Sequence, residues 1–217
     1  VRLTSNDMLH KGDWITVKSV DANGIVEDMS LTTVKVRNFD NTIVTISPAT
    51  LVNGSFQNWI GMQKSGGRRV KRIVYFDFRS IRLVDETLKQ TLLAKHFATE
   101  DSFKLKESLQ KAIEKDIEEG KDIEDLKNPA ALAPTNLQLY RRFMEKYLRQ
   151  RPEVNTELTL MVRHMEATQC GLPIEFYFFI KDKVWVNYEH ILADIMEHAY
   201  ALANEFGLKI YEQYPEQ

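Results

Sequence analysis

The sequence predicts an α+β fold: a small β-barrel followed by a ferredoxin-like α/β sandwich that carries a helical insertion. Three observations lead to this fold class. Short alternating segments separated by turns fill residues 13–59, which is typical of a small closed barrel. From residue 68 onward, strand and helix patterns follow the order β-α-β-β-α-β, which is that of a ferredoxin-like sandwich. A highly charged block at residues 104–127 interrupts that order.

The first half reads as a series of short strands. Residues 13–20 (DWITVKSV) alternate, and the turn residues DANG lead into a second strand that begins at Gly24. Residues 32–38 (TTVKVRN) place threonine and valine on one face and polar side chains on the other. After the turn NFDNT, residues 42–47 form a strand that stops before Pro48, which cannot donate to a strand ladder. The strands are expected to fill the barrel interior with one face each.

The second half begins with a strand, RVKRIVYFDF, followed by a helix over residues 85–97. Thr135 and Gln138 form a capping-box pattern for a helix that ends at Pro152. The residues of these three segments that we expect to face the core are Val70, Val74, Phe76, Phe78, Leu88, Leu92, Leu93, Leu137, Tyr140, Met144, Tyr147 and Leu148.

Two further strands are expected at residues 157–165 (ELTLMVRHM) and 174–180 (IEFYFFI), joined by the turn GLP. Asn187 is the expected N-cap of a last helix, Gly207 is a suitable residue just past its end, and LKIY forms a short final strand. The inward residues of these segments are Leu158, Leu160, Val162, Ile174, Phe176, Phe178, Tyr188, Ile191, Ile195, Ala199, Leu202 and Phe206.

The charged block at residues 104–127 contains six lysines and eight acids around a thin stripe of leucine and isoleucine. The simpler interpretation is a solvated helix with a mobile loop, inserted between two strands. The alternative is a surface that contacts a neighbouring subunit. Carboxylates that alternate with lysines favour a solvated face over an acid–base pair.

Composition restricts the class of protein. The 217 residues carry a net charge of −2, so the chain as a whole gives no electrostatic argument for nucleic-acid binding. One cysteine, Cys170, fits a reducing compartment. No apolar run approaches the ~20 residues that span a bilayer. Because the chain opens with VRLTSNDMLHKGDW and no initiator methionine, we expect it to be a piece of a longer protein.

Motifs for chemistry are missing from the sequence. His190 and His198 are eight residues apart, too far for a metal-binding pair on one helix turn, and no C-x-x-C or H-E-x-x-H pattern occurs. Cys170 has no base near it in sequence. The SGG segment at residues 65–67 precedes a strand instead of a helix, which weakens it as a phosphate site. We therefore expect no catalytic, cofactor-binding or metal-binding residue, and no enzyme activity.

One resemblance covers nearly the whole chain. The segments GDWITV and GIVEDMSLTTVKVRNFDNTIVTISPATLVNGSFQNW resemble the cytoplasmic part of the small-conductance mechanosensitive channel (MscS) family. Asp40–Asn41 matches the family turn, Asn58–Trp59 matches the closing pair, and Ala49 departs from the usual asparagine after the proline. GMQKSGGRRVKRIVYFD and the segment from residue 159 to residue 213 look like the miniconductance, YbdG-like branch of that family.

The resemblance implies an Sm-like barrel and a ferredoxin-like domain. The implied boundaries are a segment after a missing pore helix (1–12), the barrel (13–60), a basic linker (61–69) and the sandwich (70–217) with its insert at about 100–134. It also implies a homoheptamer whose cytoplasmic vestibule lies below a pore in the bacterial inner membrane. Membrane tension would open that pore and release ions and small solutes on hypo-osmotic shock. No pore residue would lie in this chain.

A basic run precedes and enters the sandwich, with Lys64, Arg68, Arg69, Lys71 and Arg72 and no acid between residues 62 and 76. An exposed linker and outward strand face is the simplest explanation. The alternatives are an ion-pair surface between subunits or domains, contact with anionic lipid and a vestibule lining that biases ion passage. Two other functions stay open: an Sm-like RNA-binding module and a soluble ring-forming scaffold. The barrel's lack of obvious exposed aromatic residues argues against RNA.

Overall fold

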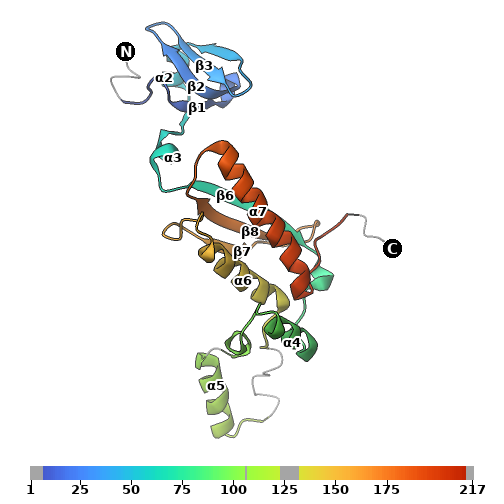
Figure 1. Cartoon of the computed structure of the whole chain (residues 1–217). Coiled ribbons are helices and arrows are strands. Elements are labelled where there is room, and N and C mark those ends of the chain that lie inside the picture. Colours follow the sequence, from blue (N-terminus) through green and yellow to red (C-terminus); the bar gives the residue numbers. More distant parts are fainter. Residues whose placement is uncertain (1–6, 106, 123–131, 214–217) are drawn as a thin grey trace. The chain divides into compact units, whose positions relative to one another are not determined.

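The computed structural model describes residues 7–105, 107–122 and 132–213 (Figure 1). The chain divides into two compact units, Val1–Arg68 and Arg69–Gln217. Each unit has its own hydrophobic core. The finer boundaries expected from the sequence, with a separate segment 1–12 and a linker 61–69, stay a prediction.

A five-stranded sheet forms the first unit, with strand order β4-β3-β2-β1-β5 and antiparallel neighbours. Alternation decides which side chains enter the core, since Ile15, Val17, Val34 and Val36 are buried while Lys35 and Arg37 are exposed. The elements are β1 (Trp14–Val17), β2 (Ala22–Met29), β3 (Val34–Asn38), β4 (Ile43–Ile46), α2 (Pro48–Asn53), β5 (Gln57–Asn58) and α3 (Ile60–Lys64).

The expectation of a closed barrel is wrong, because the hydrogen-bonded strands form an open sheet. Within the described residues β4 and β5 are the two edges of the sheet and do not pair with each other. Helix α2 follows β4 directly, because Ser47 accepts a hydrogen bond from the Thr50 amide and Pro48 occupies the first helical turn. The chain therefore leaves the sheet at this point, and β5 returns as only two residues beside β1.

The second strand also starts earlier than expected. A 3-10 turn, η1 (Lys18–Val20), and Asp21 with φ 53° reverse the chain, so β2 begins at Ala22 and includes Gly24. Gly24 lies against the backbone of Arg37 and Asn38, and a Cβ there would collide with that backbone. The glycine is thus required by close strand approach instead of by the turn.

The second unit contains a three-stranded sheet in the order β6-β8-β7, with α6 and α7 on one face (Figure 1). Its expected element order is confirmed as far as the last helix. Placing β8 between β6 and β7 is the arrangement of a split β-α-β unit. The elements are β6 (Arg68–Phe76), η2 (Phe78–Ser80), α4 (Glu86–Ala94), η3 (Glu100–Phe103), α5 (Glu107–Glu118), α6 (Asn136–Gln150), β7 (Met161–His164), β8 (Leu172–Ile180), α7 (Trp185–Ala203) and η5 (Asn204–Phe206).

Helix ends agree with the sequence in two cases and differ in a third. Thr135 accepts a hydrogen bond from the Gln138 amide at the start of α6, and Gly207 adopts φ 69° after the last turn. Asn187, by contrast, is not an N-cap. Helix α7 begins at Trp185, because the Asp182 carboxylate accepts from the Val184 amide and from the Asn187 side chain.

The strand ends also differ from expectation. Residues 157–160 are not part of a strand, and β7 is limited to Met161–His164. The final strand is reduced to a single bridge between Phe76 and Ile210, supported by backbone hydrogen bonds on either side. Phe78 is 46% exposed instead of buried, because the chain turns into η2 after Phe76 and the alternation ends there.

One core fills the space between the sheet and its helices. The alternate residues Val70, Val74 and Phe76 of β6 pack with Ile174, Phe176, Phe178 and Ile180 of β8 and with the apolar stripes of α6 and α7. Asn136 is completely buried at the start of α6, where its side chain hydrogen-bonds the backbone of Ser80, Arg82 and Phe206.

Candidate functional site

The residues that could perform chemistry do not converge. No group of three or more His, Cys, Asp or Glu side chains suitable for a metal ion occurs in the described part of the chain. His190 and His198 are exposed on α7, and Cys170 is an exposed free thiol in the turn before β8. The SGG segment leads into β6, and the Ser65 hydroxyl hydrogen-bonds carbonyl oxygens of Met62 and Gly67. Interaction surfaces are therefore the better candidates for function.

One such surface is the face of the β6-β8-β7 sheet that α6 and α7 leave uncovered. We call it the open face. Its members are the alternate residues that point away from the helices, because their neighbours in each strand lie in the core. They are Arg69, Lys71, Ile73 and Tyr75 of β6, Met161 and Arg163 of β7, and Glu175, Tyr177 and Phe179 of β8.

The open face combines aromatic rings with positive charge. Tyr177 and Phe179 meet edge to face at 6.0 Å between ring centroids, and the Arg69 guanidinium lies 5.8 Å from the Tyr177 ring centroid. Tyr75 is 39% exposed and Lys71 is exposed. Arginine and aromatic side chains are the types that protein interfaces enrich.

Glu175 is the acid of the open face, and it is 1% exposed. Its Oε1 accepts a hydrogen bond from Nε of Arg163 on the paired strand, at 2.8 Å. Its Oε2 has no hydrogen-bond partner among the described residues. A buried carboxylate oxygen without a donor is unfavourable.

The basic run is divided by the strand geometry. Lys64 ends α3, while Arg69 and Lys71 alternate with the buried Val70 and project from the open face. Arg72 lies on the opposite side of the strand and is exposed there. Arg68 belongs to the first unit, where its guanidinium lies 5.5 Å from the Trp14 ring centroid. The five cations thus do not form one patch on a single unit.

An aromatic cluster lies beside Arg68 in the first unit. Trp14 stacks on Trp59 with ring centroids 4.5 Å apart and planes 14° apart, and Phe39 meets Trp14 edge to face. Phe39 is 48% exposed, so the expectation that this domain lacks exposed aromatic residues is wrong. Trp59 and Arg68 already contact the Trp14 ring, however, and base stacking needs a free ring face.

The charged insert forms helix α5, and ion pairs link its lysines to acids of the same insert. Lys111 pairs with Glu107 and Lys115 pairs with Glu119, each four residues apart. Lys121 lies 2.6 Å from the buried Asp116 carboxylate, and this hydrogen bond raises the pKa of the lysine. Part of the expected linker at residues 128–134 and the end of the charged block lie outside the described residues.

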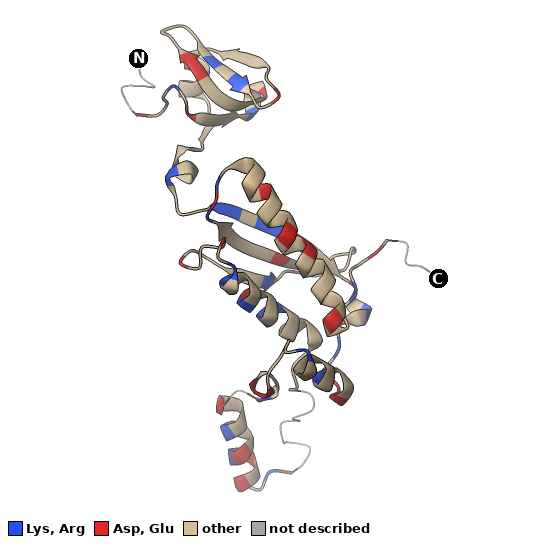
Figure 2. Ribbon diagram, in the orientation of Figure 1, with Lys and Arg blue, Asp and Glu red and all other residues tan. Residues whose placement is uncertain are grey.

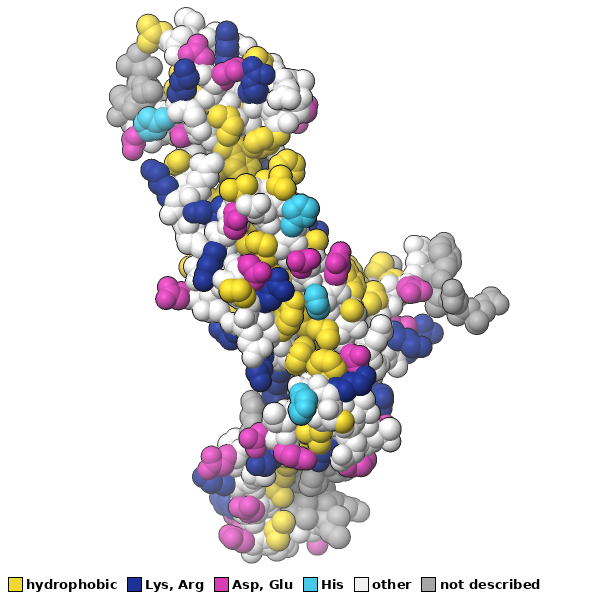
Figure 3. Space-filling view, viewed as in Figure 1, with side chains coloured by type: hydrophobic (Ala, Val, Ile, Leu, Met, Phe, Trp, Pro, Cys, Tyr) yellow, Lys and Arg dark blue, Asp and Glu magenta, His cyan; other side chains and the backbone are white. Residues whose placement is uncertain are grey.

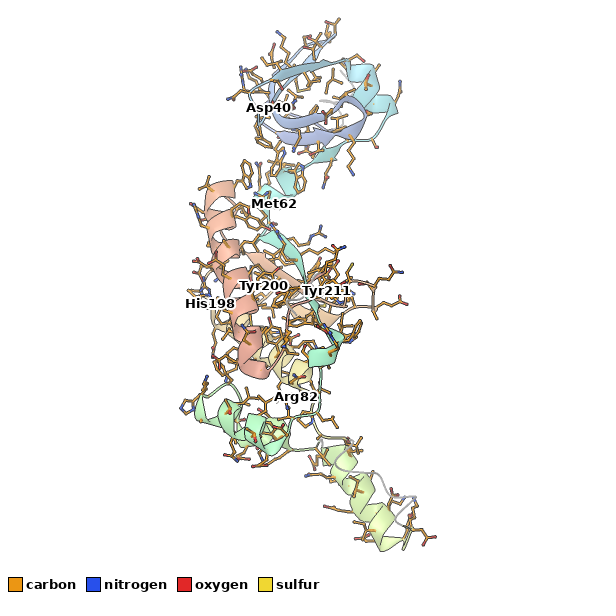
Figure 4. All side chains as sticks on the ribbon, turned by 90° about the vertical axis from the view of Figure 1, so that its right-hand side faces the viewer. Asp40, Met62, Arg82, His198, Tyr200 and Tyr211 are labelled. Carbon is orange, nitrogen blue, oxygen red and sulfur yellow. The ribbon has the colours of Figure 1, made fainter. Side chains whose placement is uncertain are left out.

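A polar depression of about 930 Å³ lies at the end of β6, lined by Asp77, Arg79, Ser80, Arg82, Asn204, Gly207, Lys209, Ile210 and Glu212. Arg82 is marked beside it in Figure 4. Hydrogen bonds from Arg79 hold the pKa of Asp77 below its ordinary value, and the bond to Asp77 raises the pKa of Arg79. Arg82 pairs with Asp85. Both arginines are therefore paired with a carboxylate of their own segment.

Comparison with known proteins identifies the first unit. Residues 1–61 match the family model described as "Mechanosensitive ion channel, beta-domain". This match confirms the resemblance to the MscS family for this part of the chain. The family is one of ion channels and not of enzymes. The YbdG-like branch stays a prediction.

Solved structures extend the similarity of fold to the second unit. The chain resembles MSL1 of Arabidopsis thaliana with a TM-score of 0.60 and 10% identity, covering 98% of this chain and 56% of that one. It resembles MscS of Helicobacter pylori in the closed state with a TM-score of 0.53 and 11% identity, covering 99% and 60%. The chain thus spans somewhat over half the length of these structures, and the expected α+β fold is confirmed.

In the part of the chain that the structure describes, no helix is both long enough and apolar enough to cross a bilayer.

Proposed function

We propose that this chain forms the vestibule of a mechanosensitive channel, on the cytoplasmic side of a bacterial inner membrane. In this proposal the chain assembles as a homoheptamer below a pore formed by other parts of the protein. Membrane tension opens the pore, and ions and small solutes leave the cell on hypo-osmotic shock. The match of residues 1–61 to the channel β-domain carries this proposal. The similarity of fold to MscS of Helicobacter pylori over 99% of the chain supports it.

The strand edges of the first unit offer a way for copies of the chain to assemble. Among the described residues the sheet ends at β4 and β5, and the backbone groups at such edges can pair with a neighbouring copy. Identical subunits joined in this way form closed rings when the rotation between neighbours closes. A ring of this kind surrounds an axis along which solutes pass before they reach the pore.

A survival assay tests the proposal. Cells that lack their own mechanosensitive channels are given the intact gene and then moved to dilute medium. The proposed function predicts survival that depends on the intact gene. Equal lysis with and without the gene, at matched protein levels in the membrane, would contradict it.

A further inference from the structure

The open face and helix α7 differ in charge. Among the side chains of the open face, Arg69, Lys71 and Arg163 are basic and Glu175 is acidic. Lys71 has no ion-pair partner in the described residues. The open face is thus a basic, aromatic surface with one buried carboxylate.

Helix α7 lies on the other side of the sheet and is acidic. Residues 185–203 contain Glu189, Asp194 and Glu197 and neither lysine nor arginine, as Figure 2 shows. Asp194 and Glu197 are exposed, and no ion pair is found for either in the part of the chain that the structure describes. Acidic and histidine side chains are visible along this helix in Figure 3.

The outward side of α7 mixes small and larger residues. Tyr188, Leu192, Ile195 and Ala199 form the buried stripe, so residues half a turn away face solvent. Ala193 and Ala201 are exposed there beside Glu197, and Val186, His190 and Tyr200 are exposed on the same helix. The two alanines allow a neighbouring surface to approach closely at Glu197.

We propose that the open face of one copy packs against the outward side of α7 in the next copy. This inference rests on the proposed self-association and adds the surfaces that carry it in the second unit. Lys71 and Arg69 would lie against Asp194 and Glu197, while Ala193 and Ala201 face Tyr177 and Phe179.

The geometry of this contact favours a ring. The open face and the outward side of α7 lie on opposite sides of the same sheet, as the rotated view in Figure 4 shows. A contact between two different surfaces is head-to-tail, so each copy has one free surface until the ring closes. A symmetric dimer would instead place the same surface on both partners, and two basic faces would repel each other.

Crosslinking tests the contact in the intact gene product, in the membranes of cells that express it. Cys170 is replaced by serine, and Lys71→Cys is combined with Glu197→Cys. A short bismaleimide is expected to give a ladder of products in the double variant. Each single variant should give no ladder, because neither surface meets itself. Lys71→Cys with Arg149→Cys, an exposed position on α6, is the matched control and should also give none.

Charge exchange supplies the second measurement. Lys71→Glu and Glu197→Lys should each reduce the assembled fraction, measured by native mass spectrometry, by several-fold. The combined Lys71→Glu/Glu197→Lys variant should restore it. Both positions are exposed, so far-ultraviolet circular dichroism of each variant should match that of the unaltered protein.

The outcomes separate this inference from the proposed function. Assembled protein without the 71–197 product overturns the contact and leaves the channel proposal standing. If the crosslink and the charge rescue are both observed but no tension-activated current is found, the contact is supported and the channel proposal is contradicted. A Lys71→Glu variant that assembles normally but no longer binds vesicles of phosphatidylglycerol would place the open face against lipid and overturn the contact. A monomer overturns both.

Discussion

Asn136 holds three separate parts of the second unit together. Its side-chain nitrogen donates to the carbonyl oxygens of Ser80, at 2.8 Å, and Phe206, at 3.0 Å. Its oxygen accepts from the amide of Arg82 at 3.0 Å. These partners are 56, 70 and 54 residues away in sequence. The start of α6 is thus joined to the end of β6 and to the end of α7 by one buried amide.

The change Asn136→Ala removes these three long-range bonds and also the bond that the Asn136 oxygen accepts from the Leu137 amide. At about 1 kcal/mol for each long-range bond, the expected decrease in the free energy of unfolding is at least about 3 kcal/mol. Urea unfolding followed by far-ultraviolet circular dichroism measures it. Helices α4, α6 and α7 belong to this unit and dominate that signal.

The matched control is Gln150→Ala, at an exposed position of the same helix. Its effect should stay within about 0.5 kcal/mol, as for other exposed substitutions. A loss below about 1 kcal/mol for Asn136→Ala would refute the reasoning, because water would then replace the amide at little cost.

Three further changes are expected to have measurable effects. Gly171 has φ 86° and lies against the Phe76 carbonyl, so Gly171→Ala should lower the urea midpoint of the second unit by the equivalent of at least about 1 kcal/mol; an unchanged midpoint would contradict this. Trp59→Ala removes the stack on Trp14 and a hydrogen bond to Thr16. With Trp185 of the second unit replaced by phenylalanine in both proteins, thermal unfolding followed by tryptophan fluorescence should show a loss of about 2 kcal/mol, the sum of about 1 each for stack and bond. Hydrogen bonds from Arg79 lower the pKa of Asp77 from 3.8, so this pair stabilises the fold above pH 3.8 and the stabilisation is lost as pH falls through the lowered pKa. Below pH 3.8 the free energy of unfolding should therefore fall less steeply with decreasing pH in Asp77→Asn than in the unaltered protein. Parallel curves for the two proteins would count against the pair.

Alternation and capping explain how much of the fold is predictable from sequence. Val34 and Val36, or Ile174, Phe176 and Phe178, occupy every second position, so their burial follows from the two-residue period of a strand. The start of α6 follows from Thr135 and Gln138 in the same way. These signals are local, since a strand face or a helix cap depends on residues a few positions apart.

The features that sequence reasoning missed depend on contacts between distant residues. Whether β4 meets β5 is decided by how far α2 carries the chain, although Ser47–Pro48 is a recognisable helix start. The length of the last strand depends on how far residues 209–211 can pair along the edge of β6. The role of Asn136 could not be read from its neighbours in sequence, because its partners are more than fifty residues away.

The candidate surfaces were partly visible in the sequence. The basic run was recognised, and Arg69 and Lys71 do share the exposed side of β6 opposite Val70. The open face as a whole was not recognised, because it becomes a surface only once α6 and α7 both cover the same side of the sheet. The pairing of Arg163 with Glu175 across β7 and β8 requires the strand register, which no local pattern specifies.

Patch-clamp recording tests the central claim most directly. The intact gene product is expressed in cells without other mechanosensitive channels, and suction is applied to excised membrane patches. The channel account predicts currents that appear above a threshold tension and vanish in patches from cells without the gene. Patches that contain the protein, as shown by immunoblot, and stay silent up to the tension that ruptures the membrane would contradict it.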